Sequence, residues 1–315
     1  MSSAADVTVP LGTTSGRARG ARLKQAAAFT VLGLLSLSIV VPTVLIVGFV
    51  LVRGWPGLSV EFLTAMPRNG MVEGGIYPAI AGSAALVAVT MLLAIPVGVL
   101  GAIYLAEYAR QGTLVRAIRI AILNLAGVPS IVYGLFGMGL FVMVVVPAMV
   151  RLLHLDPHRS SPSCLLAGAA TLALLVLPMV ITTTEEALRQ VPQHLRASSL
   201  ALGATKWQTI RRIVLPNALP GILTGLILAI GRAAGETAPI LLTGAVFYAS
   251  AMPRPAEALF RPFMALPYHL FAISTQLPNA PERLRWGTAL VLLALVLSFN
   301  AIAIALRAHL RRRRG

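Results

Sequence analysis

The sequence predicts an all-α integral membrane protein with six transmembrane helices, and its composition, apolar runs and basic residues support this fold class. Of the 315 residues, 57% are hydrophobic and only 11% are charged, whereas about a quarter of the residues of an ordinary soluble domain are charged. One hydrophobic core does not absorb such an excess, and a bilayer does. The single cysteine, Cys164, excludes an internal disulfide framework.

Several apolar runs are long enough to cross a bilayer as helices, which takes about 20 residues. The first run follows a basic segment and exceeds the roughly 7–15-residue core of a signal peptide, so we interpret it as an uncleaved membrane helix. Prolines and glycines in the third and fifth runs are tolerated where neighbouring helices satisfy the freed backbone groups. The predicted spans lie near residues 26–52, 77–106, 119–149, 163–183, 217–246 and 286–306.

The basic residues predict that both termini are cytoplasmic. With the N-terminus inside, the inside segments carry about twice as many Lys and Arg residues as the outside loops, as the positive-inside rule requires. An alternative with five spans and a re-entrant segment places the tail outside. The net charge of +16 also invites a nucleic-acid interpretation. The basic residues lie between and beyond the apolar runs rather than on one aromatic-studded face, so we expect contact with membrane lipid and no nucleic-acid partner.

These spans divide the chain into segments of different character. The first 25 residues are polar and basic, and they predict a disordered leader. The segment 265–275 predicts a short amphipathic helix that lies on the membrane surface or against a partner. The predicted segments are the cytoplasmic leader 1–25, the first transmembrane helix with its outside loop 26–72, a core of five further transmembrane helices 73–306 containing a cytoplasmic loop 184–216 and an outside loop 247–285, and a basic cytoplasmic tail 307–315.

Two charged residues lie within the fifth apolar run, in the stretch GRAAGETAPI. An arginine near the middle of a span costs about 2.5–3.5 kcal/mol on insertion scales. Arg232 and Glu236 are four residues apart, so they project from one helix face and pairing offsets part of that cost. Two interpretations stay open, namely a self-neutralising pair that locks the bundle and a polar patch facing a water-accessible path. Gly235 and Thr237 accompany the pair, and a planar guanidinium suits a phosphate-sized oxyanion.

The cytoplasmic loop 184–216 predicts a helix, a tight turn and a second helix. Gly203 allows the chain to reverse sharply, and Thr205 is the expected N-cap of an amphipathic helix over 206–214 that ends at Leu215-Pro216. Such an exposed pair of helices either docks on a partner or packs only on its own bundle, and physical reasoning leaves both open. Elsewhere, Glu107 at the inner end of the second span is expected to be an interfacial cap.

The loop resembles the EAA coupling motif of the permease subunits of ABC importers. That motif is Glu-Ala-Ala, a glycine six residues after the glutamate, an isoleucine ten residues later, and then x-Leu-Pro. Ala-Ser-Ser at 197–199 replaces Glu-Ala-Ala here, while the later positions match. In the family this loop docks a short coupling helix into a cleft of the ATPase subunit. The resemblance therefore implies coupling roles for Ala201, Leu202, Gly203, Ala204, Thr205, Ile213, Leu215 and Pro216.

Further blocks resemble the PstA-type permeases of phosphate ABC importers. They are EGGIYPAIAGS (73–83), IPVGVLGAIYLAEYA (95–109), NLAGVPSIVYGLFG (124–137), ALGATKWQTIRRIVLPNALPGILTG (201–225) and GRAAGETAPILLT (231–243). The resemblance implies a type I ABC importer permease-like fold in a bacterial plasma (inner) membrane, inorganic phosphate as the cargo, and roles for Arg232 and Glu236 in its passage. The implied partners are a homologous second permease subunit, two ATPase subunits and a periplasmic or lipid-anchored phosphate-binding protein.

The chain has no phosphate-binding loop for ATP, because its only lysines, Lys24 and Lys206, lack the flanking glycines. We therefore expect no cofactor, no metal and no enzymatic activity in this chain, and ATP with Mg²⁺ to be used by the partner subunits. Three alternatives remain. The cargo could be another oxyanion such as molybdate or sulfate; the chain could be an ion-gradient-driven transporter, which would need inverted repeats and more intramembrane acids; or it could be a non-transporting membrane scaffold.

Overall fold

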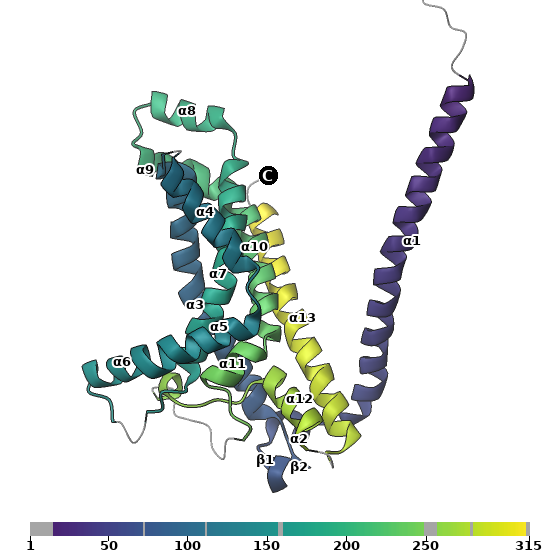
Figure 1. The fold of residues 1–315 in the computed structure, drawn as a ribbon, viewed down its shortest axis with the longest axis vertical. Helices are drawn as coiled ribbons and strands as arrows, with labels where there is room; N and C mark the ends of the chain where they lie inside the picture. Colours follow the sequence, from purple (N-terminus) through teal and green to yellow (C-terminus); the bar gives the residue numbers. More distant parts are fainter. Residues whose placement is uncertain are drawn as a thin grey trace, which may run out of the picture. The chain divides into compact units, whose positions relative to one another are not determined.

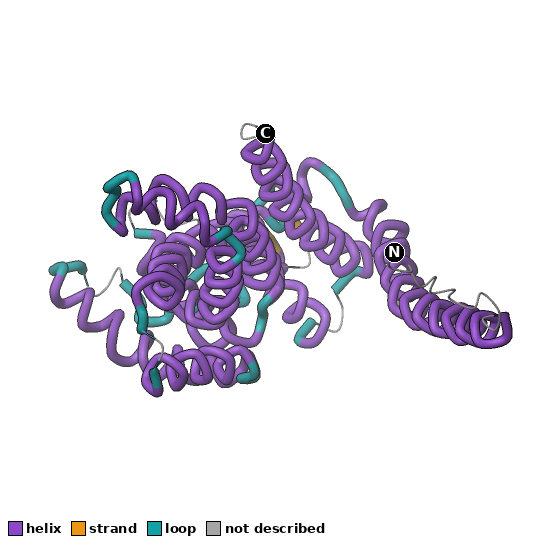
Figure 2. Tube along the Cα trace, turned by 90° about the horizontal axis from the view of Figure 1, so that it is seen from above, coloured by secondary structure: helices purple, strands orange, loops and turns teal. Residues whose placement is uncertain are grey.

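Helices make up most of the regular structure in the computed structural model, which describes residues 15–71, 73–110, 112–156, 160–248, 257–277 and 280–312 (Figures 1 and 2). The α-helices are α1 (Ser15–Gly54), α2 (Val60–Thr64), α3 (Tyr77–Ile103), α4 (Thr113–Ala126), α5 (Ser130–Gly137), α6 (Val146–Leu152), α7 (Leu165–Arg189), α8 (Gln193–Ala201), α9 (Lys206–Thr209), α10 (Leu215–Gly235), α11 (Ala238–Thr243), α12 (Leu266–Thr275) and α13 (Glu282–Arg312). The π-helical segments are η3 (Tyr104–Tyr108), η4 (Met138–Val145) and η5 (Ile210–Val214), and the 3₁₀ segments are η1 (Trp55–Gly57), η2 (Asn69–Met71) and η6 (Ala258–Phe260). The strands β1 (Pro67–Arg68) and β2 (Glu73–Gly74) form an antiparallel pair.

Six helices in the described part of the chain are long and apolar enough to cross a membrane, which confirms the predicted number. They include continuous helices that join several of the elements above, because α-helical and π-helical turns follow one another without a break. These helices are Lys24–Gly57, Tyr77–Tyr108, Ser130–Leu152, Leu165–Arg189, Lys206–Gly235 and Glu282–Ala305.

The chain divides into two compact units, residues 1–52 and 53–315. In its described part the first unit is the helix α1, which begins at Ser15. The predicted leader is therefore wrong over residues 15–25, which are helical, and its remainder lies outside the described residues. This helix has 40 residues. Because an α-helix rises about 1.5 Å per residue, it is longer than the roughly 30 Å apolar layer of a bilayer is thick.

In the second unit, α3, α7 and α10 pack side by side, and α7 is the most buried of the spanning helices. Small residues allow the close approach that packing inside a membrane favours. A side-chain carbon added at Gly98 of α3 would lie 2.6 Å from Val180 of α7, and one added at Gly225 of α10 would overlap Thr183 of α7. The helix α13 lies along α10, where the Arg307 guanidinium donates to the Thr224 hydroxyl at 2.8 Å.

The third predicted span, 119–149, is not one straight helix. The helix α4 ends at Ala126, and the Ser130–Leu152 helix begins after Pro129 and crosses the direction of α3 and α7 (Figure 1). Proline disfavours helical backbone in the residue before it, and Pro129 itself is extended with a ψ of 140°. The amphipathic α4 is thus separated from the apolar helix that follows.

The fifth predicted span begins earlier and ends earlier than expected. The helix runs without interruption from Lys206 through η5 and α10 to Gly235, so the expected end at Leu215-Pro216 is wrong. Pro216 has no N–H to donate to the carbonyl four residues before it, and its ring would crowd that carbonyl. The wider π-helical turn of η5 directly before it accommodates the proline, so the helix continues.

The second unit has two distinct ends (Figure 1). The α8–α9 turn and the C-terminal end of α13 lie at one end, and α2, the β1–β2 hairpin and α12 lie at the opposite end. The helix predicted over 265–275 is confirmed as α12. The predicted inside loop 184–216 and the predicted inside tail thus share one end of the unit.

Candidate functional site

The predicted charged pair is present, but it lies at the end of a helix rather than in its middle. Arg232 occupies the last turn of α10, and Glu236 is the residue at which the helix ends, with a ψ of 128°. The Arg232 Nε and the Glu236 Oε1 are 3.5 Å apart, and their side chains are 32% and 19% exposed. A cation in the last turn of a helix is favoured by the helix dipole, so the arginine has a local electrostatic partner besides the carboxylate.

The helix break brings together the four residues predicted to line the substrate path. Gly235 is exposed with nothing within 4 Å of where a side chain would begin, and Thr237 is half-buried without a capping bond from its side chain. Pro239 lies in the first turn of α11, the position where its missing N–H costs nothing. The pair therefore lies at an irregular backbone segment between α10 and α11, where some backbone N–H and C=O groups make no helical hydrogen bond.

Neighbouring helices approach this break closely. A side-chain carbon at Gly134 of α5 would lie 3.0 Å from the Cα of Pro239, so the glycine allows α11 to pack on α5. Beside it, Tyr133 lies within electrostatic range of Arg232, and its hydroxyl donates to the Leu125 carbonyl at 2.8 Å. Tyr133 thus bonds across helices, one of the arrangements that intramembrane polar residues favour.

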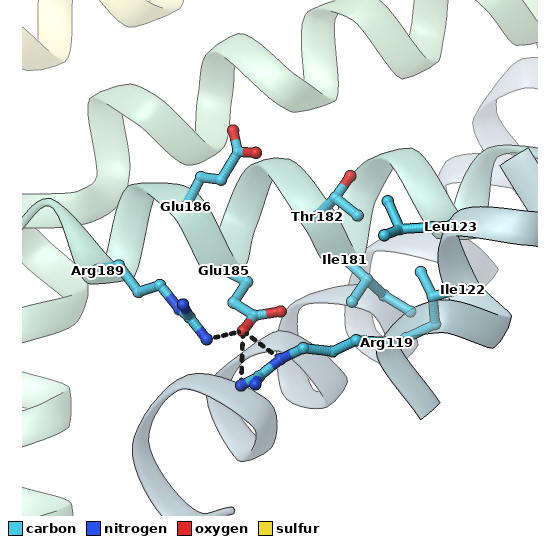
Figure 3. Close-up of a pocket in the computed structure, with 8 residues that line it drawn as sticks. All are labelled: Arg119, Ile122, Leu123, Ile181, Thr182, Glu185, Glu186 and Arg189. Carbon is cyan, nitrogen blue, oxygen red and sulfur yellow. Dashed lines mark hydrogen bonds and ion pairs between the residues drawn. The ribbon is translucent and has the colours of Figure 1, made fainter. Parts of the chain in front are cut away.

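An apolar cavity of about 450 Å³ leads from Tyr133 along α4, α5 and α7, and it includes Ile122 and Ile181. The same two isoleucines also line a second cavity of about 220 Å³, which is charged (Figure 3). Glu185 lies in this second cavity and is 8% exposed. The two cavities therefore adjoin at Ile122 and Ile181, the apolar one beside Tyr133 and the charged one at Glu185.

Glu185 accepts hydrogen bonds from two arginines on different helices (Figure 3). Its Oε1 accepts from Arg119 Nε at 3.0 Å, from Arg119 Nη2 at 2.9 Å and from Arg189 Nη2 at 2.7 Å. The Arg119 guanidinium also donates to the Leu105 carbonyl at 2.9 Å. In the sequence these arginines are only two of the basic residues of the predicted inside segments. The four-residue spacing of Glu185 and Arg189 was the available signal, while the contact to Arg119 depends on tertiary packing.

The predicted helix–turn–helix of the loop is confirmed. Gly203 has a φ of +83°, which glycine adopts without strain, and Thr205 is the N-cap of α9 in a reciprocal capping box with Gln208. The turn presents apolar side chains outward, because Leu202 is 89% exposed and Trp207 is 50% exposed. Together with Leu200, which is 50% exposed, they form an apolar surface at this end of the unit that a partner could cover.

The residues that the resemblance assigns to coupling fall into two groups in the structure. Ala201, Leu202, Gly203 and Thr205 are exposed at the turn, and Ala204 is half-buried there. The later members Ile213, Leu215 and Pro216 lie in the continuous helix and are half-buried, and Leu215 packs against the hydrophobic core. The first group therefore offers the more exposed surface to a partner.

Comparison with known proteins gives the same architecture. Residues 94–315 match the family described as binding-protein-dependent transport system inner membrane component. Among solved structures, a permease of a bacterial ABC transporter involved in the import of the acidic polysaccharide alginate superimposes with a TM-score of 0.60 at 18% identity, covering 90% of this chain and 96% of the other. A chain of the MetNI methionine ABC transporter in an inward-facing conformation gives 0.51 at 18% identity, covering 75% and 94%. These likenesses show an ABC importer permease fold.

Curated relatives cover most of the chain. Phosphate transport system permease protein PstA 1 of Mycobacterium tuberculosis (strain CDC 1551 / Oshkosh) is 34% identical over 297 residues, 93% of this chain and 91% of that protein. PstA of Yersinia pestis is 37% identical over 80% of this chain and 79% of its own, and the probable ABC transporter permease protein YqgI of Bacillus subtilis (strain 168) is 33% identical over 81% and 85%. The chain therefore belongs to the binding-protein-dependent transport system inner membrane component family, and within it to the PstA-type permeases.

Proposed function

We propose that this chain is the membrane-spanning permease subunit of an ATP-driven importer of inorganic phosphate. Its similarity to phosphate transport system permeases over most of its length supports the cargo. The observation that carries the proposal is the Arg232–Glu236 pair at the α10–α11 break, a half-exposed cationic group beside backbone that is not in a helix. The chain is a multi-pass membrane protein, and we place both of its termini in the cytoplasm.

The geometry of the pair suits transient binding of an oxyanion. Arg232 reaches Glu236 through Nε at 3.5 Å, a long contact, and the described residues offer its two terminal nitrogens no hydrogen bond. Those nitrogens can bind two oxygens of one phosphate side by side. The Glu236 carboxylate repels the same anion and keeps its binding weak, and a conduit needs weak binding because the ligand must leave.

The energy for transport comes from separate ATPase subunits in this proposal. The exposed tip around Leu202 and Gly203 docks on an ATPase subunit, which would cover the apolar side chains that the chain leaves uncovered. A second, homologous permease completes the pathway, and an external phosphate-binding protein delivers the anion. ATP-driven closure of the ATPase pair then switches the cavity between outward-open and inward-open states.

Phosphate uptake by cells carrying single substitutions tests the site. Arg232→Ala removes the anion-binding group, and Arg232→Lys keeps the charge while losing the planar fork. Losing a hydrogen bond to a charged group costs about 1.5–3 kcal/mol, so we expect uptake to fall roughly ten- to hundredfold in Arg232→Ala and less in Arg232→Lys. Glu236→Ala should also slow uptake, because a phosphate held too tightly is released slowly.

The chain offers a matched control pair. Arg261 and Glu257 have the same four-residue spacing and the same 3.5 Å separation, outside the spanning helices. Arg261→Ala should leave uptake near the wild-type level at equal membrane abundance. Normal uptake in Arg232→Ala at normal abundance would refute the site. Uptake of radiolabelled phosphate that excess molybdate or sulfate abolishes would instead identify a different oxyanion as the cargo.

A further inference from the structure

Polar contacts join the α8–α9 segment to η3, the π-helical segment that continues α3. Arg196 of α8 donates from Nε and Nη2 to the Glu107 carboxylate of η3, at 3.3 and 2.8 Å. The same guanidinium donates to the Leu188 carbonyl at 2.7 Å and to the Val191 carbonyl, at the end of α7. The two side chains are only 20% and 11% exposed. One arginine thus joins α8, α3 and the end of α7.

Lys206 of α9, the other helix of the loop, makes a second charged contact with η3. The Lys206 ammonium of α9 lies 4.8 Å from the centre of the Tyr108 ring, within the range of a cation–π interaction. A cavity of about 390 Å³, lined in part by Glu107, Arg196, Leu200 and Lys206, lies between these elements. The loop is therefore joined to η3 by directional polar contacts beside a cavity, in addition to the apolar packing of Leu195 and Ile210 in the core cluster that contains Leu105.

The helix α8 depends on such contacts because none of its residues is buried. Its other attachments are Leu195, which packs at the edge of the core, and Ser199, whose hydroxyl is 2.9 Å from that of Thr209. Leu195 packs against a core cluster that includes Ala102 and Ile103 of α3, so α8 adds one partly buried leucine to this apolar packing. The apolar side chains Leu200 and Leu202 are 50% and 89% exposed, so they are available to a partner and do not hold α8 in place.

The segment η3 is also connected to α4 and α7, through Arg119. Arg119 of α4 donates to the Leu105 carbonyl of η3 and to Glu185 of α7, the cluster drawn in Figure 3. The π-helical turn closes with a bond from the Ala109 N–H to the Tyr104 carbonyl at 2.8 Å. Such wide turns are rare and occur frequently at functional sites. A displacement of η3 therefore acts on α3, α4 and α7 together.

We propose that the Arg196–Glu107 ion pair is the link that passes a movement of α8 to α3, so that both residues position the pathway without touching the cargo. This inference rests on the proposed importer function, because that function supplies the ATPase-driven movement of α8. Glu107, expected from the sequence to be an interfacial cap, is in this view the receiving end of the link. Breaking the link should separate ATP hydrolysis from transport.

The experiment uses the complete complex in proteoliposomes, with the second permease, the ATPase subunits and the binding protein, and measures phosphate taken up per ATP hydrolysed. Glu107→Ala removes the link and leaves the two carbonyl bonds of Arg196 in place. Coupling free energies between sites of about 1–3 kcal/mol correspond to factors of roughly 5 to 150, so we expect the ratio to fall at least fivefold while ATP hydrolysis continues. If Glu107→Ala does not assemble, Glu107→Gln carries the same test with a smaller expected fall.

Arg196→Lys separates coupling from structural support. A lysine keeps a charge for Glu107 but lacks the fork that reaches the two carbonyls at the end of α7. We expect this variant to lower the Tm of the complex and to keep the phosphate-to-ATP ratio near the wild-type value. Arg212→Gln, which removes an exposed arginine from the neighbouring segment η5, is the matched control and should change neither quantity.

The possible results separate the link from the function on which it rests. A normal ratio in Glu107→Ala overturns the link, and so does a fall of equal size in Arg196→Lys or Arg212→Gln, which would indicate general destabilisation. A wild-type complex that hydrolyses ATP but takes up no phosphate would overturn the proposed function instead, before any variant is compared.

Discussion

At the scale of single residues, His269 of α12 makes the stability of the chain depend on pH. Its side chain is 2% exposed, and neither ring nitrogen has a hydrogen-bond partner in the described part of the chain. Burial lowers its pKa from 6.5 to about 4, because an apolar environment disfavours the charged imidazolium. Near pH 5 the unfolded state therefore binds a proton that the folded state does not, and unfolding becomes easier.

We expect the Tm of the chain in detergent to fall as the pH decreases from about 6.5 to 4, beyond the effect of other groups. A lowered pKa of this size corresponds to about 3 kcal/mol of unfolding free energy, which is lost progressively as the pH falls from the unfolded pKa of 6.5 to the folded pKa of about 4. His269→Leu should flatten this part of the pH profile, whereas His194→Leu, at an exposed position on α8, should leave it unchanged. Identical profiles for wild type and His269→Leu would contradict the burial argument.

Single residues also show where sequence reasoning succeeded and where it stopped. The pairing of Arg232 with Glu236 follows from their spacing, and the N-cap role of Thr205 follows from local helix chemistry, so both could be predicted. The partners of Glu107 and Glu185 could not be predicted, because Arg196 and Arg119 are far away in the sequence. Their contacts depend on which helices the fold places next to each other.

At the scale of elements, the contact between α7 and α10 depends on Gly225. A methyl group there would overlap the Thr183 side chain, so the two helices would have to separate. Overpacking of this kind typically costs about 1–3 kcal/mol, and we expect Gly225→Ala to lower the Tm of the purified chain by several degrees. Gly139→Ala is the matched control, because nothing lies within 4 Å of a side-chain carbon at that position. Equal Tm values for the two variants would show that the helices can adjust without cost.

Helix lengths were predicted better than helix breaks. The runs of apolar residues set the second and sixth spans closely, because burial in a bilayer requires a continuous apolar segment. Proline, however, has context-dependent effects. Pro129 ends one helix and starts another, while Pro216 is accommodated by a π-helical turn. Whether a proline breaks a helix depends on the backbone conformation of the turn before it and on the packing around it, and the amino-acid composition does not reveal either.

At the scale of the whole molecule, the orientation in the membrane is a prediction that labelling can check. In a Cys164→Ser background, we expect Leu202→Cys at the α8–α9 turn to react with a membrane-impermeant maleimide only in inside-out vesicles. Glu61→Cys, at the opposite end of the second unit, should react only in right-side-out cells. Both positions are exposed, so failure to react reports the side of the membrane and not burial. Three spans separate Glu61 from Leu202, so reaction of both cysteines from the same side would contradict the predicted topology.

By itself the sequence determined that the chain is a helical membrane protein with six spans, a charged pair in the fifth of them and a helix–turn–helix loop. These properties follow from local composition, spacing and turn chemistry. Only the tertiary structure decided that Arg232 and Glu236 lie at a helix break, that the later coupling positions are packed in the bundle, and that Arg196 joins Glu107. The physical reason is that a side chain's partner depends on helix packing, which brings together residues that no local pattern relates.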